Sequence, residues 1–176
     1  MRVIGTVGMP GSGKGEAARL ARERGIPVIT MGDVIRQECR DRGLDPAEHH
    51  GEIAQALRDE DGPLAIAKRS LPLIREAVEE HDTVLVDGLR SDDEVECFEE
   101  AFGEEFTLVA ITAPFEVRAE RIDARGRDNT AAETLRERDD RELGFGMGRA
   151  IEAADVEIEN TESLAAFRQR ITEVLE

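Results

Sequence analysis

Glycine and lysine residues near the N-terminus follow the pattern Gly8-x-x-x-x-Gly13-Lys14. An apolar, β-branched run, Val3 to Val7, precedes this pattern, and a helix-like segment follows it. Glycines let a backbone wrap around a phosphate with several N–H groups pointing inward, and the N-terminus of the next helix adds positive potential. The segment therefore predicts a phosphate-binding loop in which Lys14 reaches the β and γ oxygens of a nucleotide. The alternative is a glycine-rich turn without function.

The lysine at position 14 supports this prediction independently. Of the 23 basic residues in the chain, only Lys14 and Lys68 are lysine. A compact ammonium fits inside a phosphate loop where a planar guanidinium would not. The three histidines do not indicate a second catalytic or metal site, because His49, His50 and His81 have no nucleophile or metal-ligand pattern nearby. We expect these histidines on the surface.

The segment from Gly8 to Gly15 resembles the phosphate loop of adenylate kinases and related nucleoside monophosphate kinases. That family also has glycine after the lysine, but it has threonine where this chain has Glu16. A carboxylate suits the N-terminus of a helix but repels phosphates, so we expect Glu16 to point away from them. The resemblance implies these nucleotide-binding residues: Gly8, Pro10, Gly11, Ser12, Gly13, Lys14, Gly15 and Glu16.

Two later segments resemble the parts of this family that hold the acceptor. In Gly32-Asp33-Val34-Ile35-Arg36, the resemblance implies that the arginine holds the acceptor phosphate; a helix cap and a solvated arginine are the alternative. In Asp87-Gly88-Leu89-Arg90, the arginine resembles the second residue on that phosphate, and a plain strand-ending turn is the alternative. An acid at the end of an apolar strand beside a phosphate loop suits Mg²⁺, often through water. We therefore expect Asp87 to organise the metal.

The acceptor segments depart from the family in two ways. The stretch Asp87 to Arg90 is one residue shorter than the family's Asp-Gly-Phe-Pro-Arg, and Glu94 stands where adenylate kinases have a glutamine that reads adenine. A carboxylate only accepts hydrogen bonds, so it cannot donate to adenine N1. Glu94 either reads a base with N–H donors or is a surface acid, and adenosine monophosphate is in doubt as acceptor. The predicted acceptor-binding residues are Gly32, Asp33, Arg36, Gly88, Arg90 and Glu94.

Residues 118–138 carry arginines before, within and after a glycine-containing loop, and they resemble the short lid of small monophosphate kinases. Phosphoryl transfer is catalysed mainly by positioning and by neutralising charge on the transferred group, and a lid excludes water. Because Asp and Glu are interleaved, salt bridges on helix faces are the alternative. The residues that we predict to be catalytic are Lys14, Asp87, Arg121, Arg125, Arg127 and Arg138.

These segments require a scaffold that brings them to one edge. Short apolar strands alternate with helices, and apolar strands indicate burial on both faces of a parallel sheet with right-handed crossovers. Ligands of such folds lie beyond the carboxyl ends of the strands. We expect an α/β, three-layer P-loop NTPase fold with helices on both faces of a five-stranded parallel sheet in the order 2-3-1-4-5. It would contain a small acceptor-binding helical region at about 31–80 and a short lid at about 125–132.

Composition limits the classes of partner. The 176 residues fit one domain, 1–176, with 40 Asp+Glu against 23 Lys+Arg and a net charge of −17. The acid excess resembles proteins adapted to high intracellular salt, with an ordinary acidic cytosolic protein as the alternative. An acidic surface argues against nucleic acid as partner, and no apolar run approaches the ~20 residues of a membrane span. Cys39 and Cys97 have neither disulfide nor metal-ligand spacing, so we expect a cytoplasmic protein.

The expected activity is transfer of the γ-phosphoryl of ATP, bound with Mg²⁺, to a small phosphorylated acceptor. The first possibility is a kinase for a nucleoside monophosphate. The second is a kinase for another acceptor, such as a dephospho-coenzyme or a nucleoside, and the third is an ATP-binding switch that hydrolyses slowly and acts through a partner. More narrowly, the chain resembles archaeal adenylate-kinase-related, dephospho-CoA-kinase-like proteins of unassigned substrate.

Overall fold

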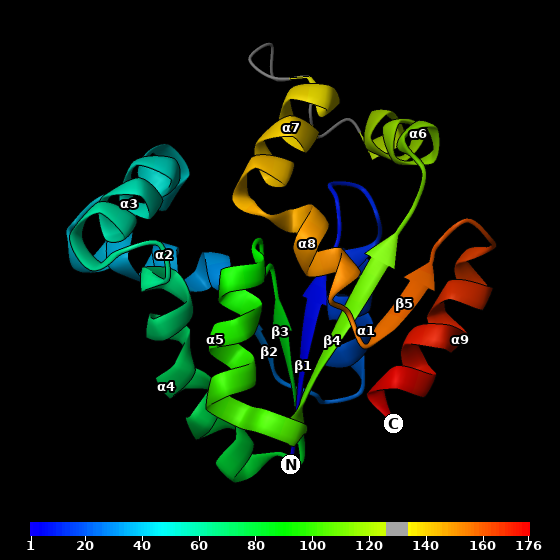
Figure 1. Cartoon of the computed structure of the whole chain (residues 1–176), viewed down its shortest axis with the longest axis horizontal. Helices are drawn as coiled ribbons and strands as arrows, with labels where there is room; N and C mark the ends of the chain where they lie inside the picture. Colours follow the sequence, from blue (N-terminus) through cyan, green and yellow to red (C-terminus); the bar gives the residue numbers. More distant parts are fainter. Residues whose placement is uncertain (126–133) are drawn as a thin grey trace.

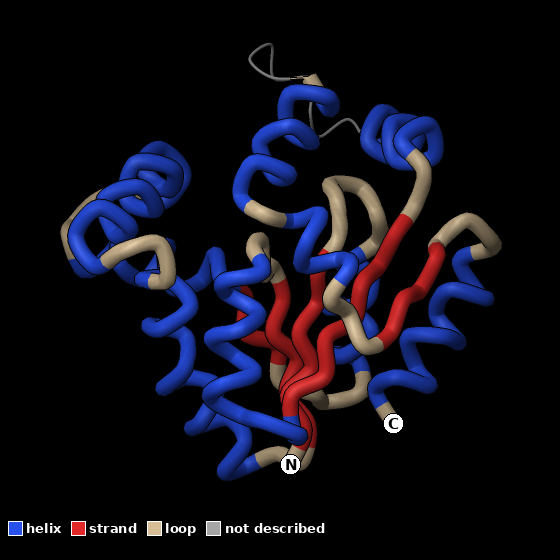
Figure 2. The backbone as a smooth tube through the Cα atoms, viewed as in Figure 1, coloured by secondary structure: helices blue, strands red, loops and turns tan. Residues whose placement is uncertain are grey.

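The computed structural model describes residues 1–125 and 134–176, which form three layers around a central parallel sheet (Figures 1 and 2). Its strands are β1 (Arg2–Val7), β2 (Val28–Thr30), β3 (Thr83–Asp87), β4 (Phe106–Thr112) and β5 (Val156–Glu159). Their order is β2-β3-β1-β4-β5 and every pairing is parallel, which confirms the predicted fold class. Arg127 and nearly all of the predicted lid lie outside the described residues.

Helices cover both faces of the sheet. On one face lie α1 (Lys14–Glu23) and α9 (Leu164–Leu175), and on the other lie α4 (Ala65–Glu80), α5 (Asp92–Phe102) and α8 (Met147–Glu152). Successive side chains of a strand point to opposite faces, so Val3 of β1 joins the core under α4 and α5 whereas Ile4 joins the core under α1 and α9. The apolar character of the strands thus follows from burial on both sides.

The remaining helices gather at the carboxyl ends of the strands. They are α2 (Met31–Asp41), α3 (Pro46–Asp61), α6 (Phe115–Arg125) and α7 (Leu135–Phe145). In Figure 1, α6 and α7 lie beyond the tips of β1 and β4, and α3 lies to the side of them. Among the described residues, no helix has both the length and the apolar character that a membrane crossing requires.

One helix was not predicted from the sequence. The stretch Gly144-Phe145-Gly146-Met147-Gly148 has the composition of a loop, yet α8 begins at Met147. Met147 and Ala150 are buried against the sheet, so tertiary packing stabilises this short helix against its poor intrinsic propensity. Gly146, with a φ of 107°, separates α8 from α7 and lets the chain change direction.

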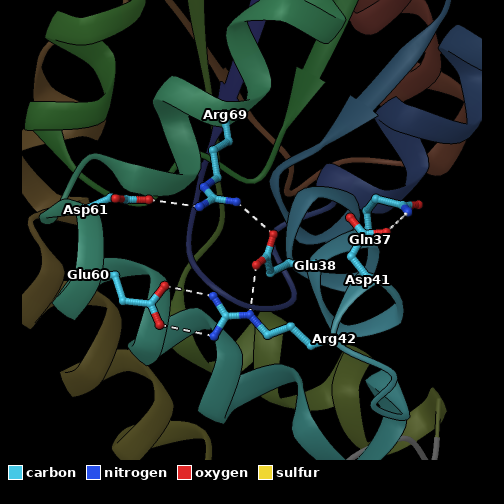
Figure 3. Close-up of polar contacts among 7 residues, drawn as sticks. All are labelled: Gln37, Glu38, Asp41, Arg42, Glu60, Asp61 and Arg69. Carbon is cyan, nitrogen blue, oxygen red and sulfur yellow. Dashed lines mark hydrogen bonds and ion pairs between the residues drawn. The ribbon is translucent and has the colours of Figure 1, made fainter.

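A network of ion pairs joins α2, α3 and α4 (Figure 3). Glu38 of α2 accepts hydrogen bonds from Arg42 at 2.8 Å and from Arg69 of α4 at 2.7 Å. Arg42 also pairs with Glu60 of α3 at 2.8 Å, and Arg69 pairs with Asp61 at 2.9 Å. Single exposed pairs stabilise a protein by less than about 1 kcal/mol, but this network connects the three helices of the predicted acceptor region.

Candidate functional site

The phosphate loop leaves β1 at Val7 and enters α1 at Lys14, as the sequence predicts. Gly11 and Gly13 have φ angles of 78° and 123°, which L side chains rarely adopt. A Cβ on Gly13 would also lie 2.5 Å from Nδ2 of Asn160, which donates to the carbonyl of Ser12 at 2.8 Å. Asn160 follows β5 and was not predicted. It lies far from the loop in sequence, and no motif around it indicates this contact.

The ammonium of Lys14 lies within the loop. Its Nζ donates to the carbonyl of Gly8 and, at 3.2 Å, to that of Met9. Burial lowers the pKa of Lys14 to about 8, while the nearby carboxylates of Asp87 and Glu142 act to raise it. Lys14 is therefore close to both carboxylates and retains a positive charge at neutral pH.

Asp87 ends β3 directly beside the phosphate loop. In the parallel register Asp87 lies opposite Thr6 of β1, and Oγ1 of Thr6 donates to Oδ1 of Asp87 at 2.8 Å. Thr6 is only 2% exposed, so this contact fixes the direction of the carboxylate. Thr6 was not predicted, although it lies one residue before the end of β1, where a partner for the end of β3 would be found.

A cavity of about 650 Å³ opens beside Asp87 between α2, α3 and the end of β3. All the predicted acceptor-binding residues line it, namely Gly32, Asp33, Arg36, Gly88, Arg90 and Glu94. The segments after β2 and β3 thus meet at one place, as the topology of a parallel sheet requires. Nη1 of Arg36 pairs with Oδ1 of Asp33 at 2.6 Å, and the Arg36 side chain is 46% exposed, so it is accessible from the cavity.

Further residues of the cavity were missed. Arg58 and His50 of α3, and Arg141 and Phe145 of α7, also line it, and with Arg22 of α1 they bring the number of arginines at this cavity to five. The guanidinium of Arg58 lies over the Phe145 ring, 5.7 Å from its centroid. His50, which was expected on the surface, is half-buried, and burial, followed by the charge of Arg36, lowers its pKa.

Of the two alternatives for Glu94, the surface acid is wrong. Glu94 is 4% exposed, and its Oε2 accepts a hydrogen bond from the backbone N–H of Arg90 at 2.7 Å. Its own N–H donates to Oγ of Ser91, the N-cap of α5, at 3.2 Å. Burial raises the pKa of Glu94, and the hydrogen bond from Arg90 opposes this shift. The carboxylate thus shapes the start of α5 and holds the Arg90 backbone while it lines the cavity.

The segments on both sides of the predicted lid are attached to the phosphate loop. Arg118 of α6 forms two hydrogen bonds with Asp139 of α7, at 2.9 and 2.8 Å, and a third with the carbonyl of Pro10 at 3.1 Å. Arg121 donates to the carbonyls of Asn160 at 2.5 Å and Ser12 at 3.4 Å. We call the Arg118–Asp139 pair with its contact to Pro10 the lid clamp.

Two other predicted lid arginines lie on the helices that flank the lid. Arg138 lies on α7, and Arg125 is the last residue of α6. Arg127 lies outside the described residues, and its catalytic role stays a prediction. Arg136 of α7, which was not predicted to be catalytic, lies over the ring of Phe115 at 4.3 Å from the centroid.

Glu16 forms ion pairs on the α9 side of α1. Its carboxylate pairs with Arg19 at 2.6 Å and with Arg168 of α9, also at 2.6 Å. The hydrogen bond from Arg19, and then that from Arg168, lower the pKa of Glu16 to about 2 against a raising effect of burial. The acid that replaces the family's threonine thus has partners of its own, and a role for it in nucleotide binding stays a prediction.

Sequence comparisons place the chain among archaeal proteins. A family model described as an AAA domain matches residues 7–136. A UPF0200 protein of Halobacterium salinarum is 63% identical over 176 residues, with coverage of 99% of this chain and 93% of the relative. A UPF0200 protein of Methanosarcina barkeri is 51% identical over 178 residues, with coverage of 99% and 95%.

Solved structures show the same fold. TT1252 from Thermus thermophilus matches with a TM-score of 0.65 and 21% identity, covering 99% of this chain and 96% of that chain. The shikimate kinase from Acinetobacter baumannii, in complex with shikimate, matches with a TM-score of 0.59 and 19% identity, covering 99% and 91%. At these identities the likeness establishes a P-loop kinase fold and not a substrate.

Proposed function

This chain belongs to the UPF0200 family and has a P-loop kinase fold, and we propose that it transfers the γ-phosphoryl of ATP to a small acceptor, a nucleoside monophosphate or a similar nucleotide. One observation carries this proposal: an arginine-lined cavity begins at Asp87, next to the phosphate loop. Direct transfer requires a donor site and an acceptor site that adjoin each other, and in this proposal both lie beside Asp87.

On the donor side, the backbone of residues 8–13 and the ammonium of Lys14 would bind the ATP phosphates. Among the described residues, no group of three or more His, Cys, Asp or Glu could hold a metal ion by itself. Mg²⁺ needs only one or two carboxylates when phosphates and water supply its other ligands, so Asp87, held by Thr6, fits a water-mediated contact. The metal would neutralise charge on the phosphates, and Arg121 would add positive charge from the lid side.

On the acceptor side, Arg36 and Arg90 would hold an anionic group. Arg58 and Phe145 provide an apolar and cationic face against which a planar acceptor can stack. In this assignment residues 31–80 form the acceptor-binding region, and the lid at about 125–132 would close over the transferred group. The family's adenine-reading glutamine is replaced by Glu94, which favours an acceptor other than adenosine monophosphate.

Two further functions are supported by particular features. A dephospho-coenzyme or nucleoside would use a hydroxyl instead of a phosphate as acceptor, and a shikimate kinase in complex with shikimate has a similar fold. A slowly hydrolysing ATP switch would use the phosphate loop alone and leave the cavity to a partner. We further propose a cytoplasmic location, on the spacing of the two cysteines, and adaptation to high salt, on the acidic composition.

An ADP-release assay at high salt across a panel of monophosphates, nucleosides and dephospho-coenzymes distinguishes these functions. We expect one acceptor to stimulate ADP release and Lys14→Met to abolish it, because the ammonium neutralises the transferred phosphoryl group. Turnover that no acceptor stimulates, but that Lys14→Met abolishes, would leave only the switch. Unchanged ATP binding and turnover in Lys14→Met would refute the site itself.

A further inference from the structure

Glu142 of α7 is a buried acid whose role the phosphate loop and the cavity do not explain. The residue is 6% exposed, and its Oε2 accepts no hydrogen bond from the part of the chain that the structure describes. Buried polar atoms are normally hydrogen-bonded, and those that are not need a specific explanation. Glu142 lies one turn after Asp139 on α7, so the two residues lie on the same face of the helix. Because the lid clamp turns Asp139 toward the phosphate loop, Glu142 faces the loop too.

Cations from three different parts of the chain surround this carboxylate. Its Oε1 lies 3.7 Å from Nη1 of Arg90, which lines the cavity. Burial lowers the pKa values of Lys14 and Arg58. The charges of Asp87 and then Glu142 oppose this shift at Lys14, and the charges of Glu94 and then Glu142 oppose it at Arg58. Lys14 belongs to the donor side, whereas Arg58 and Arg90 belong to the acceptor side. The carboxylate therefore lies where the two sides meet.

We propose that Glu142 is a positioning residue that acts as an internal counter-anion. It gathers Lys14, Arg58 and Arg90 around one point, and the phosphate groups of the substrates take over its role when they bind. This inference rests on the proposed function, because it assigns the same cations to phosphate binding. Without a counter-anion the cations would repel one another, and beside bound phosphates the fixed carboxylate opposes binding.

Calorimetric titration with pyrophosphate, in buffer with a chelator and no divalent cation, tests the inference without turnover. Glu142→Gln keeps the shape and removes the charge, so the dissociation constant should fall about tenfold, the effect of one partly screened repulsion. Glu142→Met also removes the charge and places an apolar side chain of similar length in the buried site. It should lower the dissociation constant as well, and it tests the inference even if the amide of Glu142→Gln impairs folding. Asp140→Asn removes an exposed charge from the same helix and should leave the affinity within about twofold of the wild type.

Unchanged or weaker pyrophosphate binding in both Glu142 variants would overturn the inference. Those results are expected if Glu142 is a metal ligand or a purely structural acid. In turnover, Glu142→Gln should lower the acceptor KM together with kcat, since binding loses a repulsion while the cations lose their arrangement. A failure here is distinct from failure of the proposed function, which Lys14→Met and the acceptor panel test separately. The proposed function could hold even if the counter-anion role does not.

Discussion

The surroundings of Lys14 have opposing effects on its pKa. Burial lowers its pKa to about 8, whereas the carboxylates of Asp87 and Glu142 favour the protonated form. The carbonyls of Gly8 and Met9 also accept hydrogen bonds from the ammonium. Below a pH of about 8 the free protein therefore carries the charge that phosphate binding needs, and above it the charge is progressively lost.

This balance predicts that nucleotide binding is coupled to proton uptake. A bound phosphate raises the pKa of Lys14, so ADP binding near pH 8 should take up a fraction of a proton, and affinity should fall as the pH rises further. Calorimetry in buffers of different ionisation enthalpy measures the uptake. Lys14→Met should abolish it, and uptake of the same size in that variant would assign the titration to another group.

Much of the residue-level site could be predicted because short motifs lie next to the strands that place them. Gly32, Arg36 and Arg90 were predicted in this way, and all of them line the cavity. Arg58 and Phe145 could not be predicted, because their contact depends on how α3 and α7 are placed in space. Motif arguments thus locate residues near strand ends but not those that distant helices contribute.

At the scale of elements, the lid clamp fixes α6 and α7 relative to the phosphate loop. Arg118 and Asp139 are both buried, and Arg118 also contacts the carbonyl of Pro10. The interleaved acidic and basic residues of these two helices gave no sign in the sequence of which pair is buried. Partners in a buried ion pair are set by tertiary packing, which is why this contact could not be predicted.

Breaking the lid clamp should destabilise the protein strongly. Asp139→Asn leaves the guanidinium of Arg118 buried without its counter-charge, and loss of one partner of a buried pair costs about 3–5 kcal/mol. Urea unfolding followed by circular dichroism measures this loss. The neighbouring exposed variant Asp140→Asn should stay within about 0.5 kcal/mol of the wild type. Equal stability of the two variants would show that the clamp contributes little.

At the scale of the whole molecule, the acid excess dominates the electrostatics. The net charge of −17 leaves many carboxylates without a basic partner, whereas each exposed pair of the network in Figure 3 contributes less than about 1 kcal/mol. Salt weakens both effects, because the Debye length falls from about 10 Å at 0.1 M to about 3 Å at 1 M. The repulsion involves more charges than the pairs do, so screening should favour the folded state.

The free energy of unfolding should therefore rise between 0.1 and 2 M KCl, as measured by urea unfolding at fixed pH. The increase should be steepest at low salt, where the Debye length changes most. A free energy of unfolding that falls over this range would show that the exposed ion pairs, and not the acid excess, control stability.

The central claim, that the arginine-lined cavity holds the acceptor, is tested most directly by the steady-state kinetics of Arg36→Ala. The acceptor is the one that stimulates ADP release in the wild type. Arg36→Ala should raise its KM roughly 30-fold, the size of a lost charge-assisted hydrogen bond, and leave the KM for ATP within about twofold. Arg40→Ala, an exposed arginine one turn further along α2, is the matched control and should change neither KM. An unchanged acceptor KM in Arg36→Ala, or an equal rise in the KM for ATP, would contradict the assignment of this cavity.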